Sequence, residues 1–323
     1  MSDTTIVFPA AGQKARRRLA FDAPALAGLT WPYFALSGAH DGPTLCVIAG
    51  LHGAEYPPID AVMRFCRDLD PASVRGRVIG LPVANLPAFW ERTPFVCPRD
   101  GKNPNRVFPG TPNGTFTEVL AAHIFEQVVR RGDYLIDLHG GDMVEDLTPF
   151  SVVQQTDRVD LDAVAVDLAT VFGLPYLVVE AADGAPISGT MAGAASAAGI
   201  PAFIAEAGAI GQLQTEAVDL HLRGLRRVLQ RLKMRDGTLE ALQEPVVMRE
   251  FAWSRAERGG FFRKKLAAGD YVEAGGRIGT MVDFWGDPLA EITSPVGGIA
   301  LFVTTSPAVA DNGLLVGIIG VDA

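Results

Sequence analysis

Residues 44–58, TLCVIAGLHGAEYPP, decide the fold class. Residues 44–49 form a short apolar run that ends before a glycine, which is the pattern of a buried strand. Pro57 and Pro58 then open a helical pattern that continues to Leu69. Proline is tolerated there because the first N–H groups of a helix have no partner within it. A strand, a tight turn and a helix in this order indicate an α/β protein.

The same alternation continues to about residue 235. Strands are predicted at 78–83, 134–138, 175–180 and 202–205, and helices at 115–131, 188–198 and 215–234. Thr115 and Glu118 have the spacing of a capping box. Residues 87–114 are rich in Pro, Gly and Asn, and a loop of that length is usually functional or disordered. We therefore expect a mixed, mostly parallel sheet with helices on both faces.

The pattern of apolar residues along the sequence changes after residue 237. Short apolar runs alternate with glycine-containing turns at a spacing of roughly 8–12 residues, which is typical of a small all-β barrel or sandwich. The sequence therefore predicts two domains, an α/β domain over residues 1–240 and a β-rich domain over residues 245–323.

Composition excludes several classes of partner. The chain carries 37 acidic and 28 basic residues and a formal charge of −9, and its only basic run, residues 14–18, is short. This argues against binding to nucleic acid or to an anionic membrane. The three cysteines show no C-x-x-C spacing, so neither a disulfide framework nor a thiolate metal site is indicated. Without a signal-like or membrane-spanning apolar stretch, we expect a cytoplasmic protein.

Three polar motifs stand at predicted strand ends, where ligands bind in open α/β sheets. His52 and Glu55 lie on the turn after the first strand, and three residues apart they can converge on one metal ion. His139 ends another strand, and Asp137 lies on its side of that strand because side chains alternate. A carboxylate beside an imidazole often orients a metal-bound histidine, although a buried hydrogen-bonded pair is an equal alternative.

The third motif places Glu206 in an Ala- and Gly-rich environment after the strand at 202–205. Burial there would raise the pKa of its carboxyl, which suits a general base near neutral pH. Taken alone, Glu206 could equally be an acid that caps a helix or lies on the surface. Together, His52, Glu55 and His139 predict a site for one Zn2+ ion with an open fourth position, beside Glu206. The ion would lower the pKa of bound water toward about 7.

A fourth motif lies in the long loop. Asn105 and Arg106 offer an amide and a guanidinium fork, which suit a substrate carboxylate. The alternative is an exposed, solvated loop arginine.

The segments GLHGAEYP (50–57), DGKNPNRVFPG (100–110), DLHGG (137–141) and GIPAFIAEAG (199–208) resemble, in that order, the succinylglutamate desuccinylase/aspartoacylase family of the zinc carboxypeptidase clan. The resemblance runs from about residue 40 to 235. It implies the zinc carboxypeptidase-like fold and zinc-dependent hydrolysis of the amide bond in N-acyl amino acids. By motif, the zinc ligands would be His52, Glu55 and His139, the catalytic acid/base Glu206, and the carboxylate-binding pair Asn105 and Arg106.

The sequence departs from the family pattern in two places. Pro104 stands where members often carry leucine, without removing either functional residue. The family's further arginine, which polarises the scissile carbonyl, has no clean counterpart. Arg92 and Arg99 both lie near its position, and Arg99 is our choice for this catalytic role.

The C-terminal segment resembles the biotinyl/lipoyl barrel-sandwich pattern, but no lysine occurs after Lys265 to carry such a group. We expect it to pack over the zinc face and narrow the pocket, so that the site selects small substrates.

The predicted function is a metal-dependent amidohydrolase acting on a small N-acyl amino acid. No second cationic anchor beyond Arg106 is evident, which favours a neutral or basic amino acid with a small acyl group. The family resemblance suggests N-acetyl-diaminobutyrate, the substrate of ectoine-degrading members, as one such case. A metallocarboxypeptidase acting on short peptides would use the same residues, and a non-catalytic metal- or ligand-sensing module is a third alternative. The sequence leaves open the acyl group, the amino acid, the metal used in the cell and whether the chain forms homo-oligomers.

Overall fold

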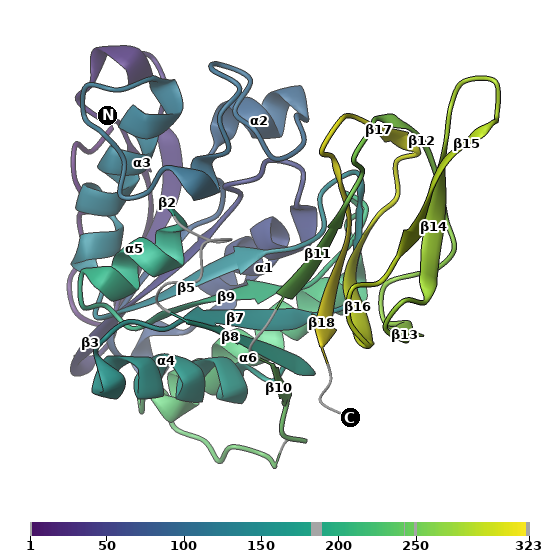
Figure 1. The fold of residues 1–323 in the computed structure, drawn as a ribbon. Coiled ribbons are helices and arrows are strands. Elements are labelled where there is room, and N and C mark those ends of the chain that lie inside the picture. Colours follow the sequence, from purple (N-terminus) through teal and green to yellow (C-terminus); the bar gives the residue numbers. More distant parts are fainter. Residues whose placement is uncertain (1, 182–188, 242, 249–250, 321–323) are drawn as a thin grey trace.

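A nine-stranded sheet runs through the larger part of the molecule (Figure 1). The computed structural model describes residues 2–181, 189–241, 243–248 and 251–320. The sheet has the order β1-β2-β4-β3-β5-β9-β7-β8-β10. Its strands are β1 (Gln13–Leu19), β2 (Trp31–Ser37), β3 (His40–Ala49), β4 (Arg75–Leu81), β5 (Tyr134–His139), β7 (Phe150–Gln154), β8 (Tyr176–Glu180), β9 (Ala202–Glu206) and β10 (Val246–Met248).

Strand directions confirm a mixed, mostly parallel sheet. β4, β3, β5 and β9 are parallel neighbours, and so are β7, β8 and β10. β1, β2 and β4 pair antiparallel, and so do β7 and β9. The Lys- and Arg-rich residues 14–18 lie in β1 at the edge of the sheet, where charged side chains discourage pairing with another chain.

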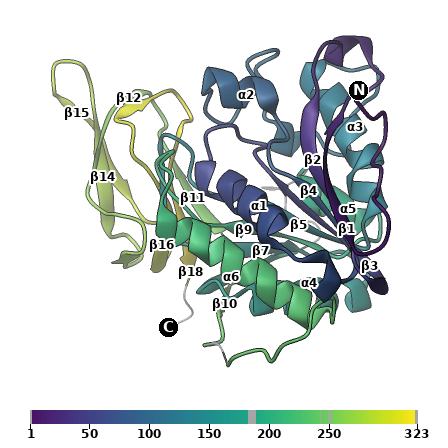
Figure 2. The same cartoon turned by 180° about the vertical axis from the view of Figure 1, so that it is seen from behind.

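Helices cover both faces of the sheet, as expected. One apolar core lies beneath α1 (Tyr56–Asp68), α4 (Val159–Phe172) and α6 (Thr215–Arg231), and Figure 2 shows these three helices on one face. The other core lies beneath α3 (Phe116–Gln127) and α5 (Met191–Ala197). Ser188, the predicted start of α5, lies outside the described residues. No helix in the described part of the chain has the length and apolar character needed to cross a membrane.

Residues 87–114 are folded onto α3. They contain most of α2 (Leu86–Glu91) and all of the 3-10 turn η3 (Pro104–Arg106). Asp100 accepts hydrogen bonds from the backbone N–H and the hydroxyl of Thr117 at 2.8 and 2.5 Å, and the Lys102 ammonium pairs with Glu118 at 2.8 Å. This segment is therefore held in place by the first turn of α3. Three further 3-10 turns are η1 (Pro24–Leu26), η2 (Pro71–Ser73) and η4 (Val129–Arg131).

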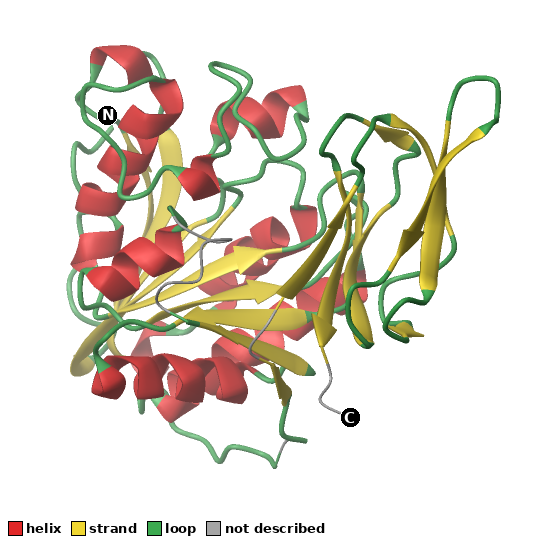
Figure 3. Cartoon of the chain, viewed as in Figure 1, coloured by secondary structure: helices red, strands yellow, loops and turns green. Residues whose placement is uncertain are grey.

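All described elements from Phe251 onward are strands (Figure 3). One sheet has the order β11-β18-β16-β13 and the other β15-β14-β12-β17, with a separate small core. The strands are β11 (Phe251–Arg255), β12 (Gly260–Lys264), β13 (Tyr271–Val272), β14 (Arg277–Val282), β15 (Pro288–Thr293), β16 (Gly298–Thr304), β17 (Ala308–Val309) and β18 (Leu314–Gly320). This segment is β-rich as predicted, and its likeness to a barrel-sandwich carrier fold stays a prediction.

Two strands connect the parts of the chain. β6 (Glu145–Leu147) pairs with β16, while β10 pairs with β8 in the main sheet. The predicted division into residues 1–240 and 245–323 remains a proposal. Because β10 belongs to the main sheet, we place the division after Met248.

Candidate active site

The ends of β3 and β5 bring three polar side chains together. These strands are parallel neighbours with Ala49 opposite Leu138, so the turn after β3 lies beside the end of β5. Gly50 has a φ of +68°, a conformation that favours glycine, and it starts the turn that carries His52. Glu55 directly precedes α1, and His139 is the last residue of β5. Ligand atoms of the two histidines and Glu55 all lie within 4.8 Å of one another.

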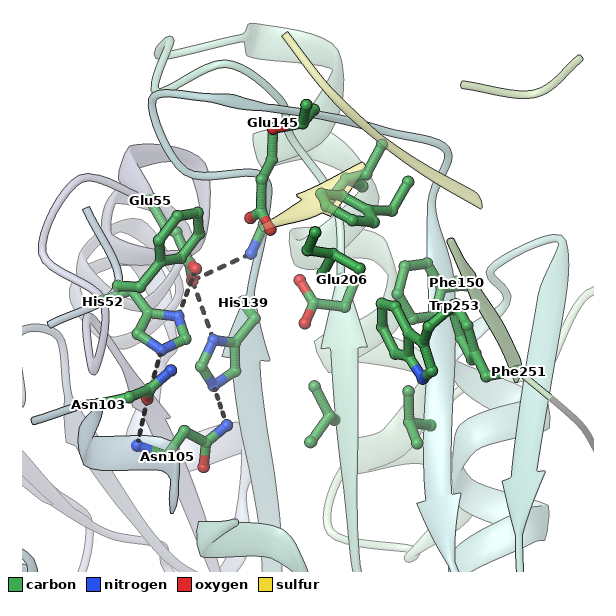
Figure 4. Close-up of a pocket in the computed structure, with 18 of the residues that line it drawn as sticks. His52, Glu55, Asn103, Asn105, His139, Glu145, Phe150, Glu206, Phe251 and Trp253 are labelled. Carbon is green, nitrogen blue, oxygen red and sulfur yellow. Dashed lines mark hydrogen bonds and ion pairs between the residues drawn. The ribbon is translucent and has the colours of Figure 1, made fainter. Parts of the chain in front are cut away.

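Glu55 stands between the two imidazoles (Figure 4). His52 Nδ1 lies 2.6 Å from Glu55 Oε1, and His139 Nδ1 lies 2.9 Å from Glu55 Oε2. Burial opposes ionisation of Glu55, but the two histidines outweigh it and hold its pKa below the ordinary value. Two imidazoles and one ionised carboxylate are a donor set found at catalytic zinc sites. The residues present therefore fit a divalent metal ion.

The outer nitrogens of both histidines have polar neighbours. His52 Nε2 lies 3.1 Å from Asn103 Oδ1, which can only accept, so this nitrogen carries the proton. His139 Nε2 lies 3.1 Å from Asp137 Oδ1, an ion-pair contact rather than an aligned hydrogen bond. Asp137 thus lies beside His139, as the alternation of side chains along the strand predicted. The Asn103 contact favours Nδ1 of His52 as the nitrogen that would face a metal ion, whereas His139 Nε2 has both Asp137 and the Asn105 amide nitrogen beside it.

Glu206 ends β9 directly opposite His139 and lines the same cavity. Burial raises the pKa of its carboxyl to about 7, with His139 and His52 opposing the shift and Glu55 adding to it. The direction agrees with the expectation from its apolar neighbours. A carboxyl with this pKa can both take up and release a proton near neutral pH. Its catalytic role remains a proposal.

The 3-10 turn η3 directs Asn105 and Arg106 inward. The Asn105 amide nitrogen lies 3.3 Å from His139 Nε2, while its oxygen accepts from the Met191 N–H at 2.9 Å. Arg106 lines the cavity, and burial lowers the pKa of its guanidinium, opposed by the charges of Glu180 and then Glu206. Arg106 therefore borders the cavity while its side chain stays exposed, and its role as carboxylate anchor remains a proposal beside the solvated-loop alternative.

Arg99 does not reach this cavity. Its side chain is exposed, and it is absent from the residues that line the pocket. Cys97, two residues earlier in the same turn, is fully buried. The expectation that Arg99 polarises the carbonyl therefore lacks a structural basis. Arg92, the other candidate, is exposed as well.

Sequence reasoning missed two charged residues of the pocket. Arg255 of β11 lines it from the C-terminal segment and donates to the Asn312 carbonyl at 3.0 Å. Glu145 of β6 also lines it, and burial, reinforced by Glu55, raises the pKa of its carboxyl well above the ordinary value. Neither residue belongs to a recognisable motif, so no sequence signal could have found them.

The cavity has a volume of about 500 Å³ and two unlike halves. Figure 4 shows His52, Glu55 and His139 on one side of Glu206 and a group of aromatic rings on the other. The C-terminal segment closes the aromatic half, which confirms that it packs over this face of the sheet. Its lining residues are Phe251, Trp253, Arg255, Phe302, Thr304 and Leu314.

His221 and the three cysteines are buried and do not line the cavity. His221 of α6 is fully buried and lies 3.1 Å from the Ala207 carbonyl, which it can reach only as a donor through Nε2. This contact supports the turn that follows Glu206. All three cysteines are free and buried, as expected for small apolar residues.

Comparison with a family model covers most of the α/β part. Residues 41–232 match the succinylglutamate desuccinylase/aspartoacylase catalytic domain. The matched span contains all of the residues assigned above by motif.

Individual proteins extend the comparison. The chain is 30% identical over 249 residues to an N-alpha-acetyl-L-2,4-diaminobutyric acid deacetylase from Halomonas elongata, covering 75% of this chain and 71% of the relative. It also resembles the crystal structure of a succinylglutamate desuccinylase/aspartoacylase from Rhodobacter sphaeroides, with 26% identity, a TM-score of 0.85, and coverage of 99% and 100% of the two chains. A product-bound structure of the ectoine utilization protein EutE (DoeB) from Ruegeria pomeroyi shares the fold, with 23% identity, a TM-score of 0.87 and coverage of 98% of each chain.

Proposed function

Because the chain belongs to the succinylglutamate desuccinylase/aspartoacylase family, we propose that it is a zinc-dependent deacylase that hydrolyses the amide bond of a small N-acyl amino acid. One observation carries the proposal: His52, Glu55 and His139 converge beside Glu206 in a cavity that could hold such a substrate. The Halomonas relative is named for N-alpha-acetyl-L-2,4-diaminobutyric acid, which is the first substrate to test.

His52, Glu55 and His139 would hold the ion, one Zn2+. When bound, it would polarise the acyl carbonyl and lower the pKa of a water molecule. Glu206 takes a proton from the water whose oxygen forms the new bond to the acyl carbon. As the carbon–nitrogen bond breaks, Glu206 returns that proton to the departing amine.

Arg106 would hold the α-carboxylate of the substrate. It remains charged despite its lowered pKa, since an arginine starts far above neutrality. Asn105 contacts His139 and the start of α5, so it would hold the side chain of His139 in place. An amide beside a guanidinium suits both oxygens of a carboxylate.

A carboxypeptidase acting on short peptides is the second candidate. It would use the same ion, base and carboxylate anchor, and the aromatic half of the cavity would suit an apolar C-terminal residue. A non-catalytic sensing module is disfavoured, because every residue of the proposed ligand set and the proposed base are present.

An amine-release assay on the zinc-loaded protein tests these alternatives. The panel comprises N-acetyl and N-succinyl amino acids, including N-alpha-acetyl-diaminobutyrate, together with dipeptides. We expect turnover of N-acyl amino acids that a chelator abolishes and zinc restores. Faster turnover of dipeptides would favour the carboxypeptidase. No turnover of any substrate, with zinc bound, would favour the sensing module. A cytoplasmic location and homo-oligomer formation remain separate proposals.

A further inference from the structure

Three aromatic rings form one continuous surface in the cavity. Phe251 and Trp253 stack with ring centroids 4.6 Å apart and planes 13° from parallel. Phe150 lies 6.1 Å from Phe251, centroid to centroid. We call these three residues the aromatic wall. Figure 4 shows the aromatic wall on the far side of Glu206 from His139.

Strand pairing fixes the distance between the wall and the metal-ligating residues. Glu206 of β9 stands between His139 of β5 and Phe150 of β7, opposite each of them in register. Neighbouring strands lie about 4.8 Å apart, so the wall begins about 10 Å from the strand that carries His139. A substrate with its amide at the metal site could therefore reach the wall with its amino acid portion.

The floor between Glu206 and the wall is apolar. Val152 of β7 pairs with Ile204 of β9, and both line the cavity. Each lies two residues from Phe150 or Glu206, so all four side chains share one face of the sheet.

Arg106 lines the same cavity as this floor. The carboxylates that act most strongly on its charge are Glu180 and then Glu206. Glu180 pairs with Gln154 of β7, which is two residues beyond Val152. A substrate carboxylate bound to Arg106 would therefore share the cavity with Ile204, Val152 and the wall.

Resting on the deacylase function proposed above, we propose that the aromatic wall binds the side chain of the substrate's amino acid, and that this side chain is aromatic or branched aliphatic. Stacking and edge contacts with Trp253 and Phe150 favour such a group. A cationic side chain would lose its hydration against this surface, since Glu206 serves in catalysis and Glu180 does not line the cavity. Glu145 lies toward the other side of the cavity, near Glu55 in Figure 4.

Trp253 offers a second observation. Its indole N–H is buried and has no acceptor among the described residues. Because Trp253 lines the cavity, an oxygen of the substrate is a natural acceptor for this donor.

Trp253→Ala tests the wall, with Trp285→Ala as the matched control. Trp285 is 87% exposed on the turn between β14 and β15 and does not line the cavity. In the zinc-loaded wild-type protein, we expect kcat/KM for N-acetyl-L-phenylalanine or N-acetyl-L-leucine to exceed that for N-acetylglycine about 10- to 100-fold. Trp253→Ala should remove most of this preference, and Trp253→Phe should restore part of it. An unchanged Tm and zinc content in Trp253→Ala, as in Trp285→Ala, verify folding.

Calorimetric binding to the Glu206→Gln protein separates this inference from the proposed function. Stronger binding of N-acetyl-L-phenylalanine than of N-acetylglycine, lost in the Trp253→Ala double variant, supports the wall even if the wild type hydrolyses neither. A higher kcat/KM for N-alpha-acetyl-diaminobutyrate or N-acetyl-aspartate would contradict the proposed role of the aromatic wall. It would still agree with the proposed deacylase function. A preference for long-chain N-acylglycines would also contradict the proposed role of the wall, since the wall would then bind the acyl group.

Discussion

Glu206 is the residue on which the proposed reaction depends most directly. Replacing it by Gln keeps the shape of the side chain and removes the proton acceptor. We expect kcat to fall by about 10²- to 10⁴-fold or more, because general base catalysis contributes on this order. Zinc content, measured by elemental analysis, should be unchanged, since the proposed metal ligands are His52, Glu55 and His139. Near-normal turnover by Glu206→Gln would exclude it as the base.

The burial of Glu206 also predicts a pH dependence. Its carboxyl must be ionised to accept a proton, and burial raises its pKa from 4.5 to about 7. Activity should therefore rise with pH through the raised pKa and fall toward acid. A bound cation stabilises the ionised form, so the acid limb of kcat/KM should lie between pH 4.5 and 7. A profile without an acid limb above pH 4.5 would contradict the raised pKa.

Motifs at strand ends predicted which residues lie close together in the structure, and the roles assigned to these residues remain proposals. His52, Glu55, His139 and Glu206 come together because each directly follows or ends a strand of one sheet. Arg99 lies in a loop and does not line the cavity, because the position of a loop depends on contacts made far away in the chain.

At the level of elements, α3 anchors the loop that carries Asn105 and Arg106. Glu118 accepts from the Thr115 N–H at 2.8 Å, which completes the predicted capping box, and it also pairs with Lys102. Glu118→Ala should lower the free energy of unfolding by about 1 kcal/mol, measured by denaturant titration. Glu118→Gln retains an acceptor for the cap and should lose less. Equal losses in both variants would assign the effect to the ion pair with Lys102.

The predicted elements of the α/β part recur in the structure with shifts of a few residues. The elements that were not predicted are α2, α4, β1, β2, β6, β7 and β10. In α4, acidic residues interrupt the apolar pattern, so the segment was not recognised as a helix. β1 is a polar edge strand, so its Lys- and Arg-rich sequence lacks the apolar alternation that marks a half-buried strand.

At the scale of the whole molecule, a bound metal ion should stabilise the native state. An ion that binds only the folded chain adds about 2.7 kcal/mol when its free concentration is 100 times its Kd. We expect a chelator to lower the Tm of the zinc-loaded protein by several degrees, measured by calorimetry, and zinc to restore it. His139→Gln should have a Tm that responds much less to the chelator. An unchanged wild-type Tm after verified zinc removal would contradict a site formed by these residues.

The sequence by itself determined the α/β class, the β-rich C-terminal segment and the positions of the polar residues that end β3, β5 and β9. These follow from local patterns, because periodicity and strand-end placement are read from neighbouring residues. Only the tertiary structure decided what encloses those residues. Phe251, Trp253 and Arg255 enter the cavity because β16 pairs with β6 and brings the C-terminal sheet over the metal-ligating residues. That contact joins residues more than 150 positions apart, and no local pattern encodes it.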